Sequence, residues 1–348
     1  MQTLSAVYIN SMKPAKNITS FLALVIILIS GGSWGFLGHK TAHQLAVYAL
    51  PSKMQRFFFK HLDYLEANAV RPDERRYSDK TEAPKHFIDI ESYGDSSEWK
   101  MPYTWDEAVA KYSKDSLVKY GYVPYQVLFV VQQLTQAFKA GNADSILFYA
   151  TDLGHYVEDA NVPLHTSVNH DGQLTNQKGL HALWETNVPE TTIEGFNLYS
   201  RHSAKYLKHP EQTIWQAVRR AHDLLPEVFG TEKNISQHFT DSNKYVTHTK
   251  NGHPVKVYST AFSKAYADSL QGTVNRQLLY AADLVADFWY TAWVNAGKPD
   301  LTALLPTAFS KEDKAALRKQ IRSYKSNHLL QDSLLLSKQK GIKPEVTE

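Results

Sequence analysis

Residues 144–165, DSILFYATDLGHYVEDANVPLH, carry the pattern from which the architecture can be derived. Apolar residues recur at helical spacing as far as Ala160, and Asp144 is a residue type that caps helix amino termini. Pro163 then ends the helix, because proline has no backbone N–H and clashes with the preceding turn. The stretch therefore predicts one helix and a turn that brings His165 inward.

The same helical periodicity continues on both sides of this stretch. The predicted helices are Thr41–Leu50, Lys53–Ala69, Trp105–Tyr120, Pro124–Ala140, Asp144–Ala160, about Leu180–Thr186, Gln212–Phe229, Ala261–Val294 and about Lys311–Ser323. Val70–Tyr93 is interpreted as an irregular surface loop. Lys244–Tyr258 alternates around Asn251-Gly252, which predicts a hairpin. The expected fold class is all-α: a single, mostly helical domain with a small β-hairpin.

The first 33 residues are typical of a signal peptide. Basic residues precede an apolar run, Ile18–Ser30, and small residues follow it. The run is shorter than the roughly 20 residues of a membrane span, although an uncleaved anchor is the alternative. Cleavage after Ser33 would make Trp34 the first residue of an exported protein, either periplasmic or secreted. Residues 34–305 are expected to form the main domain, and residues 306–348 a C-terminal helix and polar tail.

Composition excludes several kinds of chemistry. The net charge is +3 over 348 residues, so the chain lacks the polycationic signature of bulk nucleic-acid binding. Cysteine is absent, which removes thiolate metal sites, catalytic thiols and disulfides. Any zinc must therefore be bound by nitrogen and oxygen atoms.

Two pairs of histidine and carboxylate stand at the spacing of one helical turn. His155 and Asp159 are four residues apart on a predicted helix, so both side chains project from one face. His181 and Glu185 repeat this arrangement, and His165 lies between the two pairs. A single such pair is more often a solvated helix pair, but two pairs and a third histidine close together favour a metal site.

Three more candidate metal ligands precede these pairs in the sequence. His39 ends the motif WGFLGH, and Asp73 and His86 flank the sequence DERRYSDKTEAPKH. Together with HxxxDxxxxxH and HxxxE, this order resembles the superfamily of zinc-dependent phospholipases C and single-strand-specific (S1/P1-type) nucleases. The resemblance runs from Trp34 to Glu185. It implies that residues 34–305 are a helical catalytic domain that binds three zinc ions.

The resemblance also implies a role for each ligand. Asp73, His86, His155 and Asp159 would bind one zinc ion. Asp159 would bridge to a second ion, which the amine and carbonyl of Trp34 and the side chain of His39 would also bind. The third ion would be bound by His165, His181 and Glu185. Asp73 would additionally orient the attacking water, which neighbouring zinc ions make acidic enough to ionise near neutral pH.

The surroundings of the metals point to nucleic acid as the substrate. The nuclease branch has Asp-Glu-x-Arg in the loop and Phe-Ile-Asp after the metal-binding histidine. By this match Arg76 would contact a phosphate oxygen and Phe87 would stack on a base. Asp89 would accept hydrogen bonds from the edge of that base. The expected partner is single-stranded nucleic acid or a nucleotide, including 3′-nucleotides, and no segment indicates a protein partner.

Two other functions remain open at the level of sequence. One is a phospholipase C for a lipid other than phosphatidylcholine. The choline-binding branch needs an acidic residue and two aromatic residues where this chain has Leu37, Glu74 and Ala83. The other is a non-catalytic zinc-binding envelope protein. Glu185 is the phospholipase-type carboxylate, and the loop 166–178 does not match the nuclease pattern.

The remaining histidines are given structural or surface interpretations. His43 is one turn from His39 and is expected to pack in the core or support the site. His170 and Asp171 are interpreted as a polar loop tip. His202, like the other histidines further along the chain, has no carboxylate partner at comparable spacing.

Overall fold

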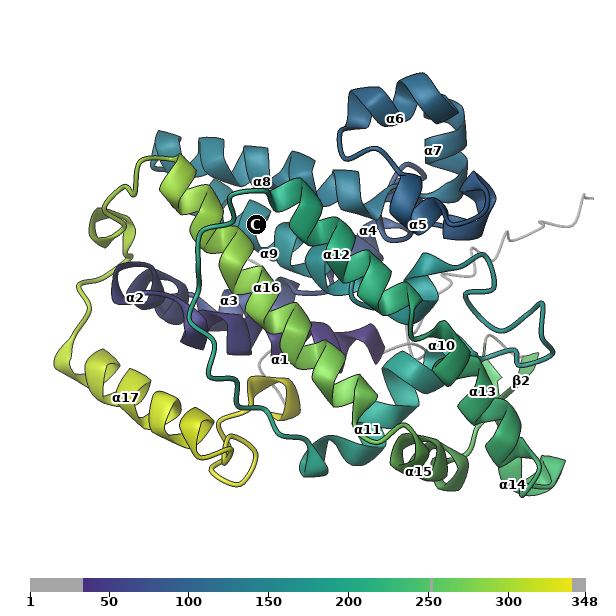
Figure 1. Cartoon of the computed structure of the whole chain (residues 1–348). Helices are drawn as coiled ribbons and strands as arrows, with labels where there is room; N and C mark the ends of the chain where they lie inside the picture. Colours follow the sequence, from purple (N-terminus) through teal and green to yellow (C-terminus); the bar gives the residue numbers. More distant parts are fainter. Residues whose placement is uncertain (1–33, 251–252, 340–348) are drawn as a thin grey trace, which may run out of the picture. The chain divides into compact units, whose positions relative to one another are not determined.

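The computed structural model describes residues 34–250 and 253–339, and these residues are mostly helical (Figure 1). The α-helices are α1 (Trp34–Ala49), α2 (Ser52–Lys60), α3 (Leu62–Asn68), α4 (Arg71–Arg75), α5 (Ser97–Lys100), α6 (Trp105–Tyr112), α7 (Lys114–Tyr120), α8 (Val123–Ala140), α9 (Ala143–Asp159), α10 (Leu180–Ala182), α11 (Val188–Thr192), α12 (Pro210–His222), α13 (Leu225–Ser236), α14 (Asp241–Lys244), α15 (Thr260–Ser269), α16 (Thr273–Asn295) and α17 (Lys311–Lys325). The short 3₁₀ segments are η1 (Ala83–Lys85), η2 (Ile90–Tyr93), η3 (Pro163–Thr166), η5 (Ile193–Gly195), η6 (Thr302–Leu304) and η7 (Leu336–Lys338), while η4 (Leu183–Asn187) is a π-helix.

The predicted fold class is confirmed. Strands β1 (Tyr245–Lys250) and β2 (His253–Tyr258) pair antiparallel, with Tyr245 opposite Tyr258. The turn residues Asn251 and Gly252, the predicted signal peptide and residues 340–348 lie outside the described residues. No helix in the described part of the chain is long and apolar enough to cross a membrane.

A helical hairpin of α8 and α9 forms one wall of the core. Gly141 ends α8 in the left-handed conformation, with φ of 64°. Asn142 caps α9, because its side-chain oxygen accepts from Ser145 N at 2.8 Å. The predicted cap Asp144 instead lies in the first turn of α9. The short connection fixes the direction in which α9 carries His155 and Asp159.

Helix α16 packs against α1, α8 and α9, as its position beside them in Figure 1 shows. Trp289 of α16 is fully buried, stacks on Phe58 with ring centroids 4.8 Å apart, and donates through Nε1 to Ala150 O at 2.8 Å. A second apolar cluster, including Trp184, Phe262 and Tyr266, joins η4 to α15. The cluster around Trp289 holds α1 and α9, and the second cluster holds η4; all three elements carry candidate ligands.

Four predicted helices are each divided into two. The divided segments are Lys53–Ala69 (α2 and α3), Trp105–Tyr120 (α6 and α7), Gln212–Phe229 (α12 and α13) and Ala261–Val294 (α15 and α16). Ser113 and Gln271 at two of the breaks have φ of 69° and 48°, which no continuing helix allows. Leu225-Pro226 begins α13 after another break, where proline disfavours continuation of the preceding helix.

Two further segments differ from expectation. Val70–Tyr93 is not simply a surface loop, since it contains α4, η1 and η2 and buries His86 and Ile88. The segment near Leu180–Thr186 is α10 followed by the π-helix η4, which contains Glu185. Such π-helical turns are frequent at functional sites.

Candidate metal centre

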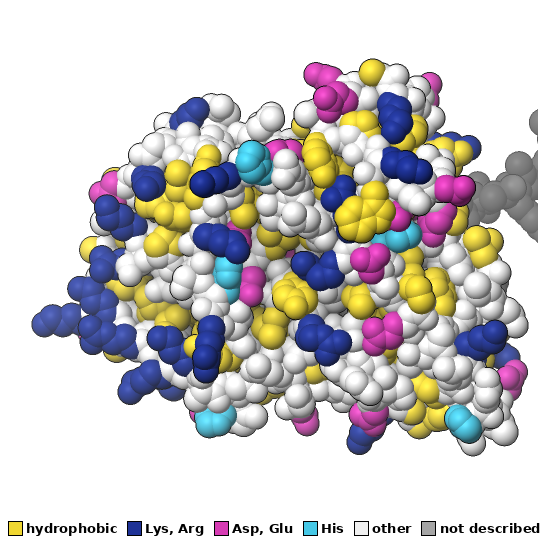
Figure 2. Space-filling model, viewed as in Figure 1, with side chains coloured by type: hydrophobic (Ala, Val, Ile, Leu, Met, Phe, Trp, Pro, Cys, Tyr) yellow, Lys and Arg dark blue, Asp and Glu magenta, His cyan; other side chains and the backbone are white. Residues whose placement is uncertain are grey.

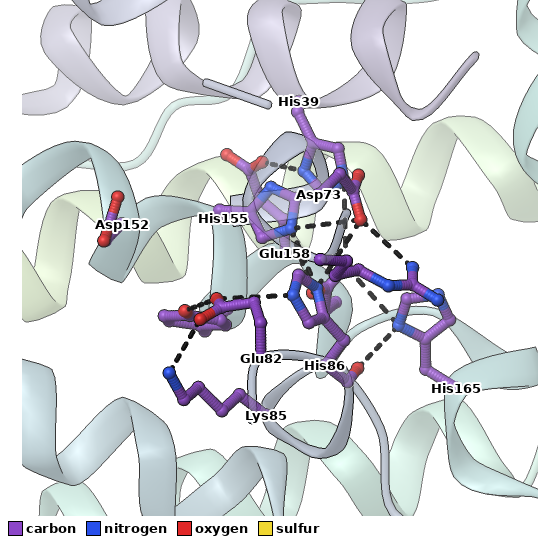
Figure 3. A network of polar contacts seen from close by, with 12 residues as sticks. His39, Asp73, Glu82, Lys85, His86, Asp152, His155, Glu158 and His165 are labelled. Atoms are coloured by element: carbon purple, nitrogen blue, oxygen red, sulfur yellow. Dashed lines mark hydrogen bonds and ion pairs between the residues drawn. The ribbon is translucent and has the colours of Figure 1, made fainter. Parts of the chain in front are cut away.

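Ligand candidates from several segments converge at one place in the described chain, and Figure 3 shows His39, Asp73, His86, His155 and His165 among them. They are His39 (α1), Asp73 (α4), His86 (after η1), His155 and Asp159 (α9), His165 (η3), and His181 with Glu185 (α10 and η4). Three groups have donor atoms within 4.8 Å of one another: His39, His155 and Asp159; Asp73, His86 and His155; and His165, His181 and Glu185. The predicted ligand Trp34 is described only as the first residue of α1.

Asp159 lies at the centre of the first two groups. Its Oδ2 is 2.9 Å from His86 Nδ1 and 3.3 Å from His155 Nε2. Its Oδ1 is 3.7 Å from His39 Nε2 and 3.4 Å from His165 Nδ1. One oxygen of this carboxylate therefore faces His86 and His155 while the other faces His39, an arrangement that suits a bridging ligand. The assignment of ligands to individual ions stays a prediction.

The third group is built from one 3₁₀ turn and the following helix. His165 Nε2 lies 3.1 Å from His181 Nε2 and 3.5 Å from Glu185 Oε1. His181 Nε2 is 2.8 Å from Glu185 Oε2. The pair at one-turn spacing and the intervening histidine are thus brought together, as the sequence pattern predicts.

Hydrogen bonds to backbone carbonyls fix how the imidazoles are presented. His155 Nδ1 donates to Ala69 O at 2.9 Å, and His165 Nδ1 donates to His86 O at 2.7 Å. With the protons assigned to Nδ1, both Nε2 atoms carry lone pairs. The lone pair of His155 faces His86 Nδ1 at 3.1 Å and that of His165 faces His181 Nε2 at 3.1 Å, so either a shared proton or a metal cation must lie between each pair of nitrogens. The donor set therefore fits divalent metal ions with nitrogen and oxygen preference, such as zinc.

Two carboxylates that spacing did not indicate support these imidazoles from behind. Glu158 is buried, bonds His39 Nδ1, and has its other oxygen 2.9 Å from His43 Nδ1. Glu82 is fully buried, and its Oε1 is 3.5 Å from His86 Nε2. Carboxylates behind metal-binding histidines fix the ring orientation and raise the basicity of the nitrogen that faces the metal.

Burial and neighbouring charges shift the pKa values of the central residues in different directions. Burial lowers the pKa of His155 to about 3, so its ring is neutral at pH 7. Burial acts against charge on Asp159 too, but the imidazoles of His155 and His165 outweigh it and hold the Asp159 pKa below its ordinary value. Burial lowers the pKa of His39, yet the bond to Glu158 and nearby carboxylates raise it to about 10. A metal ion at His39 must therefore displace a proton.

Helix α4 is held against α9 by a second charged network. Asp152 of α9 accepts from Arg71 Nη2 at 2.6 Å and from Arg75 Nη2 at 2.9 Å. Arg75 also contacts Glu82 at 3.0 Å. This network sets the position of Asp73, which lies between the two arginines on α4.

The predicted substrate residues are within three positions of Asp73 or His86 in the chain. Arg76 points outward with its side chain 49% exposed, and its Nη1 is 3.3 Å from Asp73 Oδ1. Phe87 and Asp89 follow His86, and the backbone of Asp89 donates to Tyr120 O at 2.7 Å. Burial, together with the charge of Glu91, raises the pKa of Asp89 to about 6. Their roles stay predictions.

Two histidines outside the ligand set have closer partners than the sequence suggested. His170 is exposed, but its ring centroid lies 6.4 Å from that of His181, so this loop tip stands beside the third group. His202 does have a carboxylate partner, because its Nε2 is 2.7 Å from Asp287 Oδ1. These residues are 85 positions apart, a distance that no local spacing rule covers.

Comparison with known proteins agrees with this geometry. The profile of the S1/P1 Nuclease family matches residues 34–287, a range that contains every ligand candidate. Nuclease S1 of Aspergillus oryzae (strain ATCC 42149 / RIB 40) is 27% identical over 182 residues, which are 47% of this chain and 58% of that protein. The chain thus matches less than two thirds of that relative's length. Because the family profile covers more than half of the chain, this chain belongs to the S1/P1 nuclease family.

Proposed function

We propose that the protein is a three-zinc phosphoesterase that cleaves phosphodiester bonds of single-stranded nucleic acid and also accepts 3′-nucleotides. The observation that carries this proposal is the convergence of imidazole nitrogens and carboxylate oxygens around Asp159 and around Glu185. Family membership supports hydrolysis of phosphodiester bonds by this centre.

Each side chain then has a definite task. Bound zinc ions supply an ionised water near neutral pH and neutralise charge on the phosphate. Asp73, with its side chain 30% exposed, accepts a hydrogen bond from the attacking water and holds it in line with phosphorus. Arg76 reaches a phosphate oxygen from the rim. Phe87 offers a ring on which an unpaired base stacks, and Asp89 accepts from the edge of that base.

The experiment is a comparison of substrates with protein that begins at Trp34 and is loaded with zinc. We expect chelator-sensitive cleavage of single-stranded DNA and RNA, release of phosphate from 3′-nucleotides, and no diacylglycerol from mixed phospholipids. His165→Ala should abolish turnover, whereas His209→Ala, at a side chain 65% exposed, should leave it unchanged. Full zinc loading without cleavage of any nucleic acid would overturn the proposal, and diacylglycerol release would assign the centre to lipid instead.

A further inference from the structure

Helix α17 carries a charge out of proportion to the rest of the chain. Its 15 residues include six basic and two acidic side chains, a net charge of +4, whereas the whole chain has +3. The remaining residues together are therefore close to neutral. The net positive charge of the chain therefore comes from this one helix.

The six basic residues form a single face. At about 100° per residue, they fall within an arc of roughly 140°, and all are exposed. We call this face the basic stripe: Lys311, Lys314, Arg318, Lys319, Arg322 and Lys325. The opposite side of α17 faces the protein, where Tyr324 packs against Tyr48 with centroids 5.0 Å apart and Asp313 pairs with Lys60 at 2.8 Å.

No described carboxylate neutralises the basic stripe. Within residues 34–250 and 253–339, none of its six cations has a carboxylate oxygen within 4.0 Å, while Asp313 faces inward. The neighbouring helix α2 adds Lys53 and Arg56, which are exposed as well. Figure 2 shows Lys and Arg side chains gathered on the left of the view, over the region where Figure 1 places α17 and α2.

The dimensions of the stripe suit a phosphate backbone. The fourteen steps from Lys311 to Lys325 span about 21 Å at 1.5 Å per residue, roughly six nucleotides at 3.4 Å each. A helix that binds a lipid surface needs an exposed apolar face. On α17 the large apolar side chains, such as Tyr324, are turned into the protein. The charge of the stripe fits a polyanion, and the inward direction of the large apolar side chains of α17 favours a nucleic-acid strand over a membrane.

We propose that the basic stripe is a secondary binding surface for the phosphate backbone of single-stranded nucleic acid, separate from the metal centre. The two sites are joined by α1. His39 near the start of α1 faces the centre, and Tyr48 near its end donates to Gln320 of α17 at 2.7 Å. Nine residues of helix separate them by about 14 Å. A strand must therefore extend several nucleotides beyond the cleaved bond to occupy both sites, and in this sense the inference rests on the proposed function.

The test compares long and short strands at equilibrium. Binding of labelled (dT)30 and (dT)4 is measured by anisotropy with zinc-loaded protein in an Asp73→Asn background, so that cleavage does not interfere. The triple variant Lys314→Gln, Arg318→Gln, Arg322→Gln should bind (dT)30 about tenfold more weakly at 0.1 M salt and show a salt slope lower by about 2, because three fewer counterions are released. Its affinity for (dT)4 should not change.

A matched triple variant separates the stripe from general charge. Lys139→Gln, Lys233→Gln, Lys264→Gln removes the same charge from exposed positions on α8, α13 and α15 and should leave (dT)30 binding near that of the parent. Equal losses in both triple variants, or no loss in the stripe variant, would overturn the proposal. The proposal would also be overturned if the stripe variant bound (dT)30 as the parent does and lost binding only to phosphatidylglycerol vesicles.

The same variants distinguish this proposal from the proposed function. With Asp73 restored, the stripe variant should cleave (dT)4 at the parental rate and lose efficiency only on (dT)30. If the parent cleaves no nucleic acid at all, the proposed function fails. The role of the basic stripe is still tested, because it depends only on how much more weakly the stripe variant binds (dT)30 than the parent does.

Discussion

Among single residues, Glu158 has the most consequential position outside the ligand set. Both ring nitrogens of His43 lie within 3.1 Å of backbone carbonyl oxygens, those of His39 and Thr151, so the ring needs both protons. Burial lowers the pKa of His43, but the charge of Glu158 outweighs it and raises that pKa. The negative charge of Glu158 thus offsets the positive charge of the protonated His43 ring. Its contact with His39 Nδ1 also turns His39 Nε2 toward Asp159.

We predict that Glu158→Gln weakens zinc binding while the fold persists. The amide is nearly the same size, yet it removes the charge that makes His39 a good ligand. Loss of such a supporting carboxylate costs about 10- to 100-fold in metal affinity. Competition with a chromogenic chelator measures the affinity, and circular dichroism checks the fold. Glu66→Gln, which removes a carboxylate that pairs with Lys40 at 2.9 Å, is the control; equal zinc affinity in the two variants would contradict the prediction.

The limits of spacing rules are clearest at this scale. His155 and Asp159 could be paired from sequence because a helix places residues four apart on one face. Glu158 is adjacent to Asp159 and therefore points about 100° away, and its partner His39 is 119 positions distant. The remote ligands His39, Asp73 and His86 were found through resemblance to a family, since no local periodicity connects them to α9.

At the scale of elements, the approach of α1 to α9 depends on a residue without a side chain. Gly154 lies inside α9, and a Cβ atom there would be 2.4 Å from His43 Nε2. His43 is fully buried and bonded at both nitrogens, so it cannot move aside freely. This close contact lets His39 stack on His155 with ring centroids 4.2 Å apart.

We predict that Gly154→Ala destabilises the protein, against the usual trend. Alanine inside a helix normally gains about 0.5–1 kcal/mol over glycine. Here the added methyl must displace His43 and with it α1, at a cost of about 1–3 kcal/mol. Urea unfolding measures the difference. Gly230→Ala in α13 is the matched control, because nothing lies within 4 Å of its Cβ position, and it should stabilise. Changes of the same sign would refute the close-contact explanation.

The existence of most helices followed from periodicity, but their ends often did not. Helical periodicity continues on both sides of Ser113 and Gln271, so it does not mark the breaks there. Backbone conformation at a single residue decides such a break, and neither residue is a type that favours positive φ. The hairpin was predicted well because Asn-Gly prescribes a specific turn.

On the scale of the whole molecule, the metal centre joins segments that are far apart in the sequence. Its ligand candidates come from α1, α4, the segment after η1, α9, η3, α10 and η4, and Asp73 with Asp159 adds like charges to one cluster. Without cations, the Nε2 lone pairs of His155 and His165 face carboxylate oxygens 3.3–3.5 Å away. Metal binding and folding should therefore be coupled, since a ligand that binds only the folded state stabilises it.

We predict that removal of metal lowers the thermal stability of the whole domain. An ion present at a hundred times its dissociation constant contributes about 2.7 kcal/mol, and at about 2–4 °C per kcal/mol for a domain of this size class the melting temperature should fall by roughly 5–10 °C per strongly bound ion. Differential scanning calorimetry with and without chelator measures the shift. Zinc should restore it and magnesium should not, because nitrogen donors suit zinc far better. Asp159→Asn, which removes the shared carboxylate charge, should melt low and respond little to chelator. A melting temperature that is identical with and without chelator in the parent would show that the converging side chains stabilise the fold without metal.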